Sequence, residues 1–328
     1  MPLPRIMPGS PQRPPVPPPV DRSARRRRSL RGIGIALAAL LITVGIACAP
    51  AIPSLNGIGS AWTSFVPWTA VPLVLLGALA AVRNAWWGLS AVLVAAMVWS
   101  GVFVPQLIPA SAASTADLVV ATQNIGAANT DPAAAARNLA ASGAGIVAVQ
   151  EIAGATDDAT AVLDGQYRFH ARVSTVGLWS QWPMGSPEPL ELGLSWARAF
   201  RVVVHHTEGD IAVYAVHLPS VRPGDTAARD DAIKELTALV AADPASRVLV
   251  MGDLNAATTD PTLNSLTGVL ADSRETVRGG FGFTWPAEFP MTRPDHVLGR
   301  GLTAVSDTVL AAGGSDHRGV LVALDRTG

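Results

Sequence analysis

Cysteine is nearly absent from this chain, because Cys48 is the only one in 328 residues. An internal disulfide is therefore excluded, and cysteine usage leaves the redox compartment open. The sequence also lacks a P-loop, a Gly-x-Gly-x-x-Gly signature and any internal repeat, and Ser180 has no Gly-x-Ser-x-Gly context. These absences disfavour nucleotide-binding folds of those two types and acyl hydrolases.

Positive charge is scarce in the last two thirds of the chain. Nine of the 24 basic residues and one of the 25 acidic residues precede Ala110, which leaves a net charge of about −9 on the remainder. Tight nucleic-acid binding usually requires a stripe of arginine or lysine, and none is present here. Tight nucleic-acid binding is therefore not indicated, whereas bound cations would offset part of the negative charge.

Apolar residues are concentrated in the first third. The apolar content of 49%, together with the positive mean hydropathy of +0.33, is too high for an ordinary soluble enzyme. Three apolar stretches, at residues 32–52, 65–82 and 85–108, each approach the ~20 residues that cross a bilayer. The sequence therefore predicts a three-helix transmembrane region within residues 32–110, with the lipid bilayer as a partner.

Arginines predict the orientation of these helices. Residues 1–31 are rich in proline and contain an arginine cluster at 25–28, so we expect a disordered cytoplasmic tail. Arg83 fits a short cytoplasmic turn, and three crossings then place the chain after Ala110 outside the cytoplasm of a multi-pass membrane protein. The alternative is a cleaved twin-arginine or lipoprotein signal with Cys48 as the lipidated residue, which the two following apolar stretches disfavour.

The remainder, residues 116–328, is long enough for one domain with a large core. Strand-like runs alternate with turns and with a few helices, which predicts two packed sheets with outer helices rather than a doubly wound sheet. Residues 133–141 and 226–241 are predicted helices, and residues 192–197 are among the predicted strands.

Polar residues of hydrolytic types follow several predicted strands. In the most regular case, an apolar run at 248–251 ends in Gly252-Asp253-Leu254-Asn255. A strand end holds side chains rigidly, and Asp253 and Asn255 can point to the same side. An Asx-type turn that only closes the strand is the alternative interpretation. The other residues at strand ends are Asn124, Glu151, His217, Asp316 and His317.

Each of these residues alone has a structural explanation. Glu151 fits a solvated strand end, and His217 fits a core imidazole with satisfied hydrogen bonds. Their repetition within one domain favours a shared site instead. His205 and His206 are weaker candidates for a metal site, because neighbouring strand residues face opposite sides.

The strand-end motifs, in their order along the chain, resemble those of the metal-dependent endonuclease/exonuclease/phosphatase superfamily. The matching segments are Ala121-Thr122-Gln123-Asn124, Val149-Gln150-Glu151, Ala215-Val216-His217-Leu218, Gly252-Asp253-Leu254-Asn255, Arg293-Pro294-Asp295-His296-Val297-Leu298 and Ser315-Asp316-His317-Arg318. The ordered set spans almost the whole of residues 116–328 and is specific, although no segment is specific alone. It resembles a membrane-anchored bacterial member of the superfamily.

The resemblance implies a deoxyribonuclease-I-like fold of the α+β class, a four-layered α/β/β/α sandwich, here preceded by three transmembrane helices. It also implies a divalent cation, Mg²⁺ before Mn²⁺, because hard oxygen ligands suit these ions. The implied metal ligands are Asn124, Glu151 and Asp316, and the implied catalytic residues are His217, Asp253, Asn255, Asp295 and His317.

The implied roles divide the work of phosphate ester hydrolysis. Asp253 and Asn255 would orient the attacking water and the phosphate oxygens, and His217 would stabilise the transition state. His317 would act as general base or phosphate ligand, while Asp295 would fix the tautomer of an imidazole. Whether Asp253 or His317 accepts the proton stays open at this point, as does the number of metal ions.

Two positions depart from the family pattern. Gln181 stands where relatives often carry arginine, and Pro294 replaces an aliphatic residue before Asp295. These departures weaken an assignment of the substrate and leave the reaction class unchanged.

The expected function is a membrane-anchored, extracytoplasmic, metal-dependent phosphoesterase that hydrolyses a phosphodiester of a lipid headgroup or of the envelope. An extracytoplasmic endonuclease or exonuclease is the first alternative, and a catalytically inactive, membrane-anchored binding module is the second. The sequence leaves the substrate and the oligomeric state open.

Overall fold

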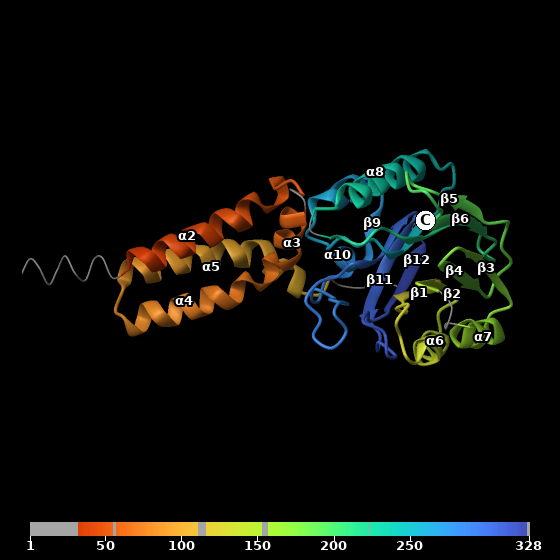
Figure 1. The fold of residues 1–328 in the computed structure, drawn as a ribbon, viewed down its shortest axis with the longest axis horizontal. Helices are drawn as coiled ribbons and strands as arrows, with labels where there is room; N and C mark the ends of the chain where they lie inside the picture. The colour runs from red at the N-terminus through yellow and green to blue at the C-terminus, as the bar shows by residue number, and fades with distance from the viewer. Residues whose placement is uncertain (1–31, 55–56, 111–115, 153–156, 223, 327–328) are drawn as a thin grey trace, which may run out of the picture.

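The computed structural model describes residues 32–54, 57–110, 116–152, 157–222 and 224–326. The predicted cytoplasmic tail at residues 1–31 lies outside them. Figure 1 shows a rod of helices from the first third of the chain, joined at one end to a layered domain formed by the rest. The predicted limits of these regions stay predictions.

Apolar side chains cover the outside of the rod. Within the described residues, three helical segments are long and apolar enough to cross a membrane: Ile33–Ala51, Ile58–Val82 and Trp86–Leu107. Their parts are α2 (Ile33–Cys48), η1 (Ala49–Ala51), α3 (Ile58–Phe65), η3 (Val66–Thr69), α4 (Ala70–Val82) and α5 (Trp86–Leu107). Large apolar side chains such as Leu41, Val82 and Trp86 are mostly exposed, as expected of helices that face lipid.

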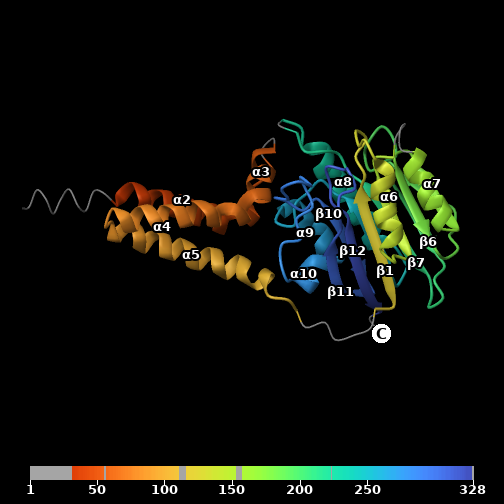
Figure 2. The same ribbon diagram turned by 90° about the horizontal axis from the view of Figure 1, so that it is seen from below.

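The second segment begins at Ile58 rather than at the predicted residue 65. Pro67 lies in the first turn of η3, where its missing N–H costs no helical hydrogen bond. The helical path therefore continues from α3 through η3 into α4. Figure 2 shows α3 at the junction between the rod and the layered domain.

In the described chain, the layered domain contains two sheets of six strands each. The first has the order β11 (Leu302–Val309), β12 (Val320–Arg326), β1 (Leu118–Asn124), β2 (Ile146–Gln150), β4 (Val176–Ser180), β3 (Phe169–Val173). The second has the order β5 (Glu188–Leu190), β6 (Ala199–Val204), β7 (Ile211–His217), β8 (Val248–Asp253), β10 (Asp295–Arg300), β9 (Ala271–Asp272).

Apolar side chains from the inner faces of both sheets form the central core, in which Val120, Leu178, Val213 and Met251 are fully buried. The helices α6 (Pro132–Ala141) and α7 (Asp157–Gln166) cover the first sheet, and α8 (Ala227–Ala242) covers the second. Figure 1 shows α8 at the top and α6 and α7 at the bottom, with the sheets between them. The predicted four-layered sandwich is confirmed.

Hydrogen bonds join the rod to the sheet domain. The indole Nε1 of Trp68 donates to the carbonyl oxygen of Met291 at 2.8 Å, and Thr259 Oγ1 donates to the carbonyl oxygen of Thr63 at 2.5 Å. The short helices η5 (Pro261–Leu263), α9 (Asn264–Thr267) and α10 (Ser273–Val277) lie in the same part of the domain. The rod is therefore held by specific contacts as well as by the chain itself.

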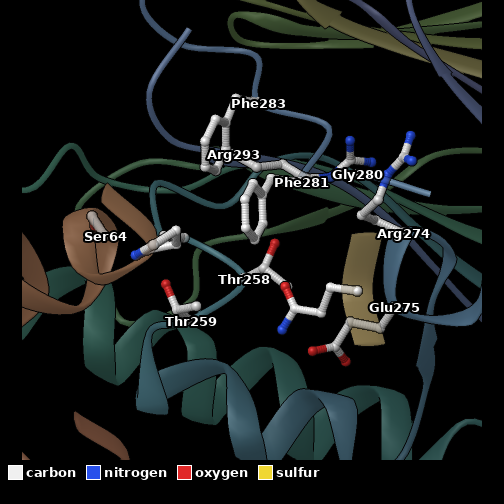
Figure 3. Close-up of a pocket in the computed structure, with 12 residues that line it drawn as sticks. Ser64, Thr258, Thr259, Arg274, Glu275, Gly280, Phe281, Phe283 and Arg293 are labelled. Carbon is white, nitrogen blue, oxygen red and sulfur yellow. The ribbon is translucent and has the colours of Figure 1, made fainter. Parts of the chain in front are cut away.

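A small cavity at this junction has a volume of about 20 Å³, which is space for about one water molecule. Figure 3 shows Ser64 of α3 on one side of it, Phe281 and Phe283 above, and Arg274 opposite. None of the predicted site residues lines this cavity. It belongs to the packing between the anchor and the domain rather than to the candidate active site.

Candidate active site and metal centre

Strand ends from both sheets bring the predicted site residues together. Asn124 and His217 end β1 and β7, Asp253 ends β8, and Glu151 directly follows β2. The pairs β1–β2 and β7–β8 are parallel, so their carboxyl ends meet at one edge of each sheet. Strand β10 runs antiparallel to β8, which places Asp295 opposite Asp253.

Asn124 connects carboxylates that belong to different sheets. Its amide Nδ2 donates to Glu151 Oε1 and to Asp253 Oδ2, each at 3.1 Å. The backbone N–H of Ala127 also donates to Glu151 Oε2, at 2.7 Å. Burial opposes ionisation of Glu151, but the hydrogen bonds from Ala127 and Asn124 hold the pKa of its carboxyl below the ordinary value. Glu151 is therefore a fixed carboxylate at neutral pH.

Residues at these strand ends have positive φ angles, which residues other than glycine rarely adopt. Glu151 has φ of 62° and Asn255 has φ of 49°. Gly252 has φ of 143°, and a Cβ at this position would collide with the carbonyl oxygen of Val216. Left-handed conformations of residues other than glycine concentrate at functional sites. Asp253 Oδ1 accepts from the backbone N–H of Asn255 at 2.8 Å, so the predicted Asx-type turn is present and also fixes the orientation of the Asp253 carboxylate.

A buried carboxylate orients the imidazole of His317. Its Nδ1 lies 2.9 Å from Asp295 Oδ2, which also accepts a 2.6 Å hydrogen bond from Thr284 Oγ1. Its Nε2 faces Asp253 Oδ2 at 4.0 Å. Burial disfavours the charged imidazole, but the charge and hydrogen bond of Asp295 outweigh burial and raise the pKa of His317 to about 10. The ring is therefore cationic at neutral pH in this arrangement.

The pKa values of Asp253 and His217 are shifted in opposite directions. Burial raises the pKa of Asp253 to about 6, although the nearby His317 offsets part of this effect. Burial and the positive charge of Arg198 lower the pKa of His217 to about 4. His217 is thus neutral at pH 7, and its Nε2 lies 3.6 Å from Glu151 Oε1 and 3.9 Å from Asp253 Oδ2.

The donors at this edge fit a hard divalent cation. Glu151, Asp253 and Asp316 line one cavity with carboxylate oxygens, the ligands that Mg²⁺ prefers. Asn124 turns its nitrogen toward Glu151, and its Oδ1 accepts from the backbone N–H of Gly126 at 3.0 Å. Ligation through Asn124 therefore requires rotation of its amide, whereas Glu151 and Asp316 present carboxylate oxygens directly.

A second group of potential ligands overlaps with the first. Asp253, Asp295 and His317 each offer one ligand atom within 4.8 Å of the others. The hydrogen bond between Asp295 and Nδ1 of His317 gives this group a different character, because a carboxylate that orients an imidazole leaves only Nε2 free for chemistry. The geometry therefore fits proton transfer or phosphate binding better than a second metal cage.

The cavity that these residues share has a volume of about 400 Å³. One wall comes from Glu151, Asp253, Asn255, Asp316 and His317, and the facing wall includes Ser60, Ala61, Ser64 and Phe65 of α3. The helix that leads into the membrane segment α4 thus forms part of the candidate active site. Only some of the predicted residues line this cavity. His217 lines an adjacent cavity that also contains Glu151, and Asn124 and Asp295 line neither of the two.

Two contacts at the site were not predicted from the sequence. Arg198 Nη2 lies 3.2 Å from Nδ1 and 3.3 Å from Nε2 of His217. Arg229 Nη1 donates to the carbonyl oxygen of Asn255 at 2.8 Å. Arg198 precedes its strand, and Arg229 lies within α8, so neither follows the strand-end pattern that identified the other residues.

Gln181 and the two weaker metal-site candidates, His205 and His206, lie outside the candidate active site. The backbone N–H of Gln181 donates to Gly145 O, before the amino end of β2, so this departure from the family pattern is remote from Glu151. His205 pairs with Asp210 at 2.9 Å, and His206 packs against the Trp182 ring. Neither histidine belongs to a group of three potential metal ligands in the part of the chain that the structure describes.

Comparisons with known proteins agree with this geometry. The endonuclease/exonuclease/phosphatase family profile matches residues 121–317, which include every predicted site residue. An endonuclease/exonuclease/phosphatase from Beutenbergia cavernae DSM 12333 has a similar structure, with a TM-score of 0.54 and 21% identity over 65% of this chain and 72% of that chain. A comparison with curated proteins gives no match.

TDP2 from D. rerio is a second structural neighbour. The form humanized by 14 mutations has a TM-score of 0.54 and 17% identity, over 63% of this chain and 98% of that chain. The D. rerio protein complexed with a single-strand DNA product has a TM-score of 0.53 and 16% identity over the same shares. At these identities the similarity shows a common fold.

Proposed function

The chain belongs to the endonuclease/exonuclease/phosphatase family, and on that premise we propose that it is a metal-dependent phosphodiesterase acting at the outer surface of the membrane that anchors it. The observation that carries this proposal is the cavity shared by Asp253, His317 and α3, in which catalytic side chains face a segment of the anchor. The favoured substrate is a phosphodiester of a lipid headgroup or of another envelope molecule.

Glu151 and Asp316, with Asn124 after rotation of its amide, would hold the divalent cation. When bound, Mg²⁺ supplies positive charge that offsets the negative charge of the phosphate as the attacking oxygen approaches. The fixed, ionised carboxylate of Glu151 supports this assignment, because its hydrogen bonds hold it in one orientation.

The two carboxylates beside His317 would perform different tasks. Asp295 accepts a hydrogen bond from Nδ1 and so stabilises the imidazolium, whose Nε2–H would donate to a phosphate oxygen. A cationic imidazole cannot accept a proton, so Asp253 Oδ2 would take the proton from the attacking water. Asn255, whose Nδ2 lies 3.3 Å from Asp253 Oδ2, would help to orient that water.

His217 and Arg198 would stabilise charge on the other side of the phosphate. The Nε2 of His217 lies near both Glu151 and Asp253. A phosphate bound beside these two carboxylates would therefore also lie beside the His217 ring. Donors that face the developing charge in a partly buried site contribute strongly to phosphate ester hydrolysis.

The length of the second membrane segment supports a substrate at the membrane surface. Its 25 residues exceed the roughly 20 that cross a hydrocarbon core about 30 Å thick. Its first part, α3, turns away from the axis of α4 at the end of the rod beside the sheet domain (Figure 2). The α3 end would therefore reach the headgroup region. Phe65, Trp285 and Phe289 expose 38%, 37% and 62% of their surfaces there, and Phe65 and Trp285 line the cavity itself.

An extracytoplasmic nuclease is the second candidate, favoured by the similarity to a protein whose structure was determined with a single-strand DNA product. The net charge of about −9 after Ala110 opposes tight DNA binding. A catalytically inactive, membrane-anchored binding module is the third candidate. The position of the His317 ring, hydrogen-bonded to Asp295 at 2.9 Å and 4.0 Å from Asp253 Oδ2, argues against it.

The test uses the full chain in lipid nanodiscs with Mg²⁺. We expect headgroup release from phospholipid, loss of release with a chelator, and a decrease of about 10²-fold or more in Asp253→Asn. Asp210→Asn is the matched control, because this exposed carboxylate pairs with His205 just before β7, whereas His217 lies at the other end of that strand. Cleavage of an oligonucleotide without lipid hydrolysis would establish the nuclease alternative, and cleavage of neither would leave the binding module.

A further inference from the structure

A second cavity of about 460 Å³ adjoins the candidate active site. It shares Glu151 and Ser220 with the first cavity, but none of the described residues of the rod lines it. Its wall includes Arg198, Arg222 and the half-exposed ring of Trp196. A substrate whose phosphate lies at Glu151 can therefore extend one arm toward α3 and the other arm into this second cavity.

Arg198 is held in place without an anionic partner. Its guanidinium carbon lies 5.0 Å from the centroid of the Trp196 ring, and its Nη2 lies 3.2 Å from Nδ1 of His217. Its Nε is buried and makes no hydrogen bond. Among the described residues, no carboxylate oxygen lies within 4 Å of the guanidinium of Arg198 or Arg222, although both face the same cavity. Arginine guanidinium groups bind carboxylate and phosphate groups through paired hydrogen bonds.

In the part of the chain that the structure describes, the acidic residues around this cavity attract Arg198 without a direct ion pair. Burial lowers the pKa of Arg198, and the charges of Asp253 and Glu151 oppose this shift. Asp225 is exposed, and it pairs with Arg222 through backbone groups, with Asp225 N donating to Arg222 O at 2.9 Å. Glu151 lies at the boundary with the first cavity, where Asn124 and Ala127 hold its carboxylate. The wall of the second cavity thus contains two arginines, an aromatic ring and two carboxylates, Glu151 and Asp225. Neither guanidinium pairs directly with a carboxylate from the ranges that the structure describes.

We propose that Trp196, Arg198 and Arg222 form an anion subsite, which binds a second negatively charged group on the polar arm of the phosphodiester. This inference rests on the proposed function, because it assumes that the scissile phosphate lies between the two cavities. The substrate class that it defines is a lipid phosphodiester whose headgroup carries a further phosphate or carboxylate. Ser220, which both cavities share, lies between the scissile phosphate and the subsite.

The experiment compares headgroups that differ in a single anionic group. Phosphatidylglycerol phosphate is paired with phosphatidylglycerol, and phosphatidylserine with phosphatidylethanolamine, each in nanodiscs that contain the full chain and Mg²⁺. We expect kcat/KM to be about tenfold or more higher for the lipid of each pair that has the additional anionic group. A ratio of about tenfold corresponds to the free energy of about one charge-assisted hydrogen bond. The difference should appear mainly in KM, because the second anion is remote from the reacting atoms.

Variants locate the effect. Arg222→Gln should lower kcat/KM more for the lipid with the additional anionic group than for its partner without that group, and Trp196→Ala should act in the same direction. Arg168→Gln is the matched control, because this exposed arginine lies over Phe169 at the far edge of the first sheet. Bis(p-nitrophenyl) phosphate, which has no second anion, reports on the catalytic centre itself.

The outcomes separate this inference from the proposed function. If the wild-type chain hydrolyses no diester, both are wrong. If it hydrolyses both members of each pair equally, or if Arg222→Gln reduces them by the same factor, the subsite is wrong and the phosphodiesterase stands. An Arg222-dependent cleavage of an oligonucleotide, without lipid hydrolysis, would place the second anion on nucleic acid and overturn the lipid substrate.

Discussion

Ser60 Oγ accepts a 2.8 Å hydrogen bond from Arg229 Nη2, although Ser60 lies on α3 of the rod and Arg229 on α8 of the sheet domain. Both side chains are almost fully buried. The same guanidinium donates through Nη1 to the carbonyl oxygen of Asn255 and to Asp260 Oδ2. One arginine therefore connects the anchor to the turn that presents Asp253 and Asn255.

Removal of the Ser60 hydroxyl should weaken this connection. Ser60→Ala leaves a buried N–H of Arg229 without a partner, which costs about 1–3 kcal/mol of stability. We expect a severalfold lower kcat in nanodiscs, because Arg229 also holds the Asn255 turn. Thr43→Ala is the control, since its hydroxyl only bonds Ala39 O within α2. Equal kcat values for Ser60→Ala and the control would show that the anchor does not position the site.

Replacement of Glu151 should remove the cation. Glu151→Gln keeps the shape of the side chain but loses its negative charge, so Mg²⁺ binding should weaken by about 10-fold or more. Calorimetric titration of the full chain with Mg²⁺ measures this directly, without reference to turnover. Glu191→Gln, an exposed residue away from the candidate site, is the control. Unchanged Mg²⁺ affinity in Glu151→Gln would place the ion elsewhere.

The charge state of His317 should depend on Asp295. With Asp295 present the imidazole titrates at about 10, so it stays protonated below that pH. In Asp295→Asn the attraction is removed while burial remains, so the pKa of His317 should fall. The ring should then lose its proton at a lower pH than in the wild-type chain. NMR titration of the His317 ring measures the shift, and kcat should decrease by on the order of 10²-fold or more. A His317 pKa that is equal in both forms would contradict this role.

The positions of the strand ends were predictable because local residue patterns determine them. The run at 248–251 ends in a glycine whose backbone conformation excludes a side chain, and the structure places Asp253 at the end of β8. The predicted helix at 226–241 corresponds to α8, Ala227–Ala242. Parallel pairing of β1 with β2 and of β7 with β8 then brings these ends together. The catalytic and metal-binding roles stay predictions.

Local patterns failed where the backbone turns without a strong signal. Residues 192–197, a predicted strand, form a turn, because Leu192 and Gly193 both adopt positive φ angles of 51° and 73°. The helix α7, Asp157–Gln166, was not predicted, since its aspartates and Gly165 resemble loop composition. The apolar residues at 192–197 alternate as in a β-strand, and this pattern led to the wrong prediction. Gly193 interrupts the extended conformation that a strand requires.

Contacts between distant segments could not be predicted at all. The residues of α3 are apolar or small, and in the sequence they only precede a membrane helix. Their place in the wall of the cavity follows from the packing of the rod against the sheet domain, and 169 positions separate Ser60 from Arg229. Arg198 likewise becomes relevant only through its approach to His217.

Stability at low pH should depend on Asp243. Burial opposes its ionisation, but hydrogen bonds from Arg201 at 2.6 Å and from Tyr214 at 2.7 Å help to lower the pKa of this carboxyl to about 2. The unfolded value is about 3.9, so the stabilisation is present above that pH and is lost as the pH falls toward 2. Asp243→Asn should lower the free energy of unfolding by on the order of 2 kcal/mol at pH 7 and flatten its pH dependence in this window. Thermal unfolding between pH 2 and pH 7 measures both, and an unaltered pH dependence would contradict the assignment.

The orientation of the chain can be tested at three points along it. Arg83 is exposed in the turn between α4 and α5, at the end of the rod remote from the sheet domain (Figure 1). Arginine in short loops is retained in the cytoplasm, so this end of the rod should face inward and the sheet domain outward. A reporter that is active only outside the cytoplasm should therefore give signal after Ser54 and after Gly328 and none after Asn84. A reporter active only in the cytoplasm should give the reverse pattern. Cytoplasmic signal after Gly328 would show that the candidate active site lies on the cytoplasmic side of the membrane. The substrate would then be a phosphodiester of the inner leaflet or of the cytoplasm.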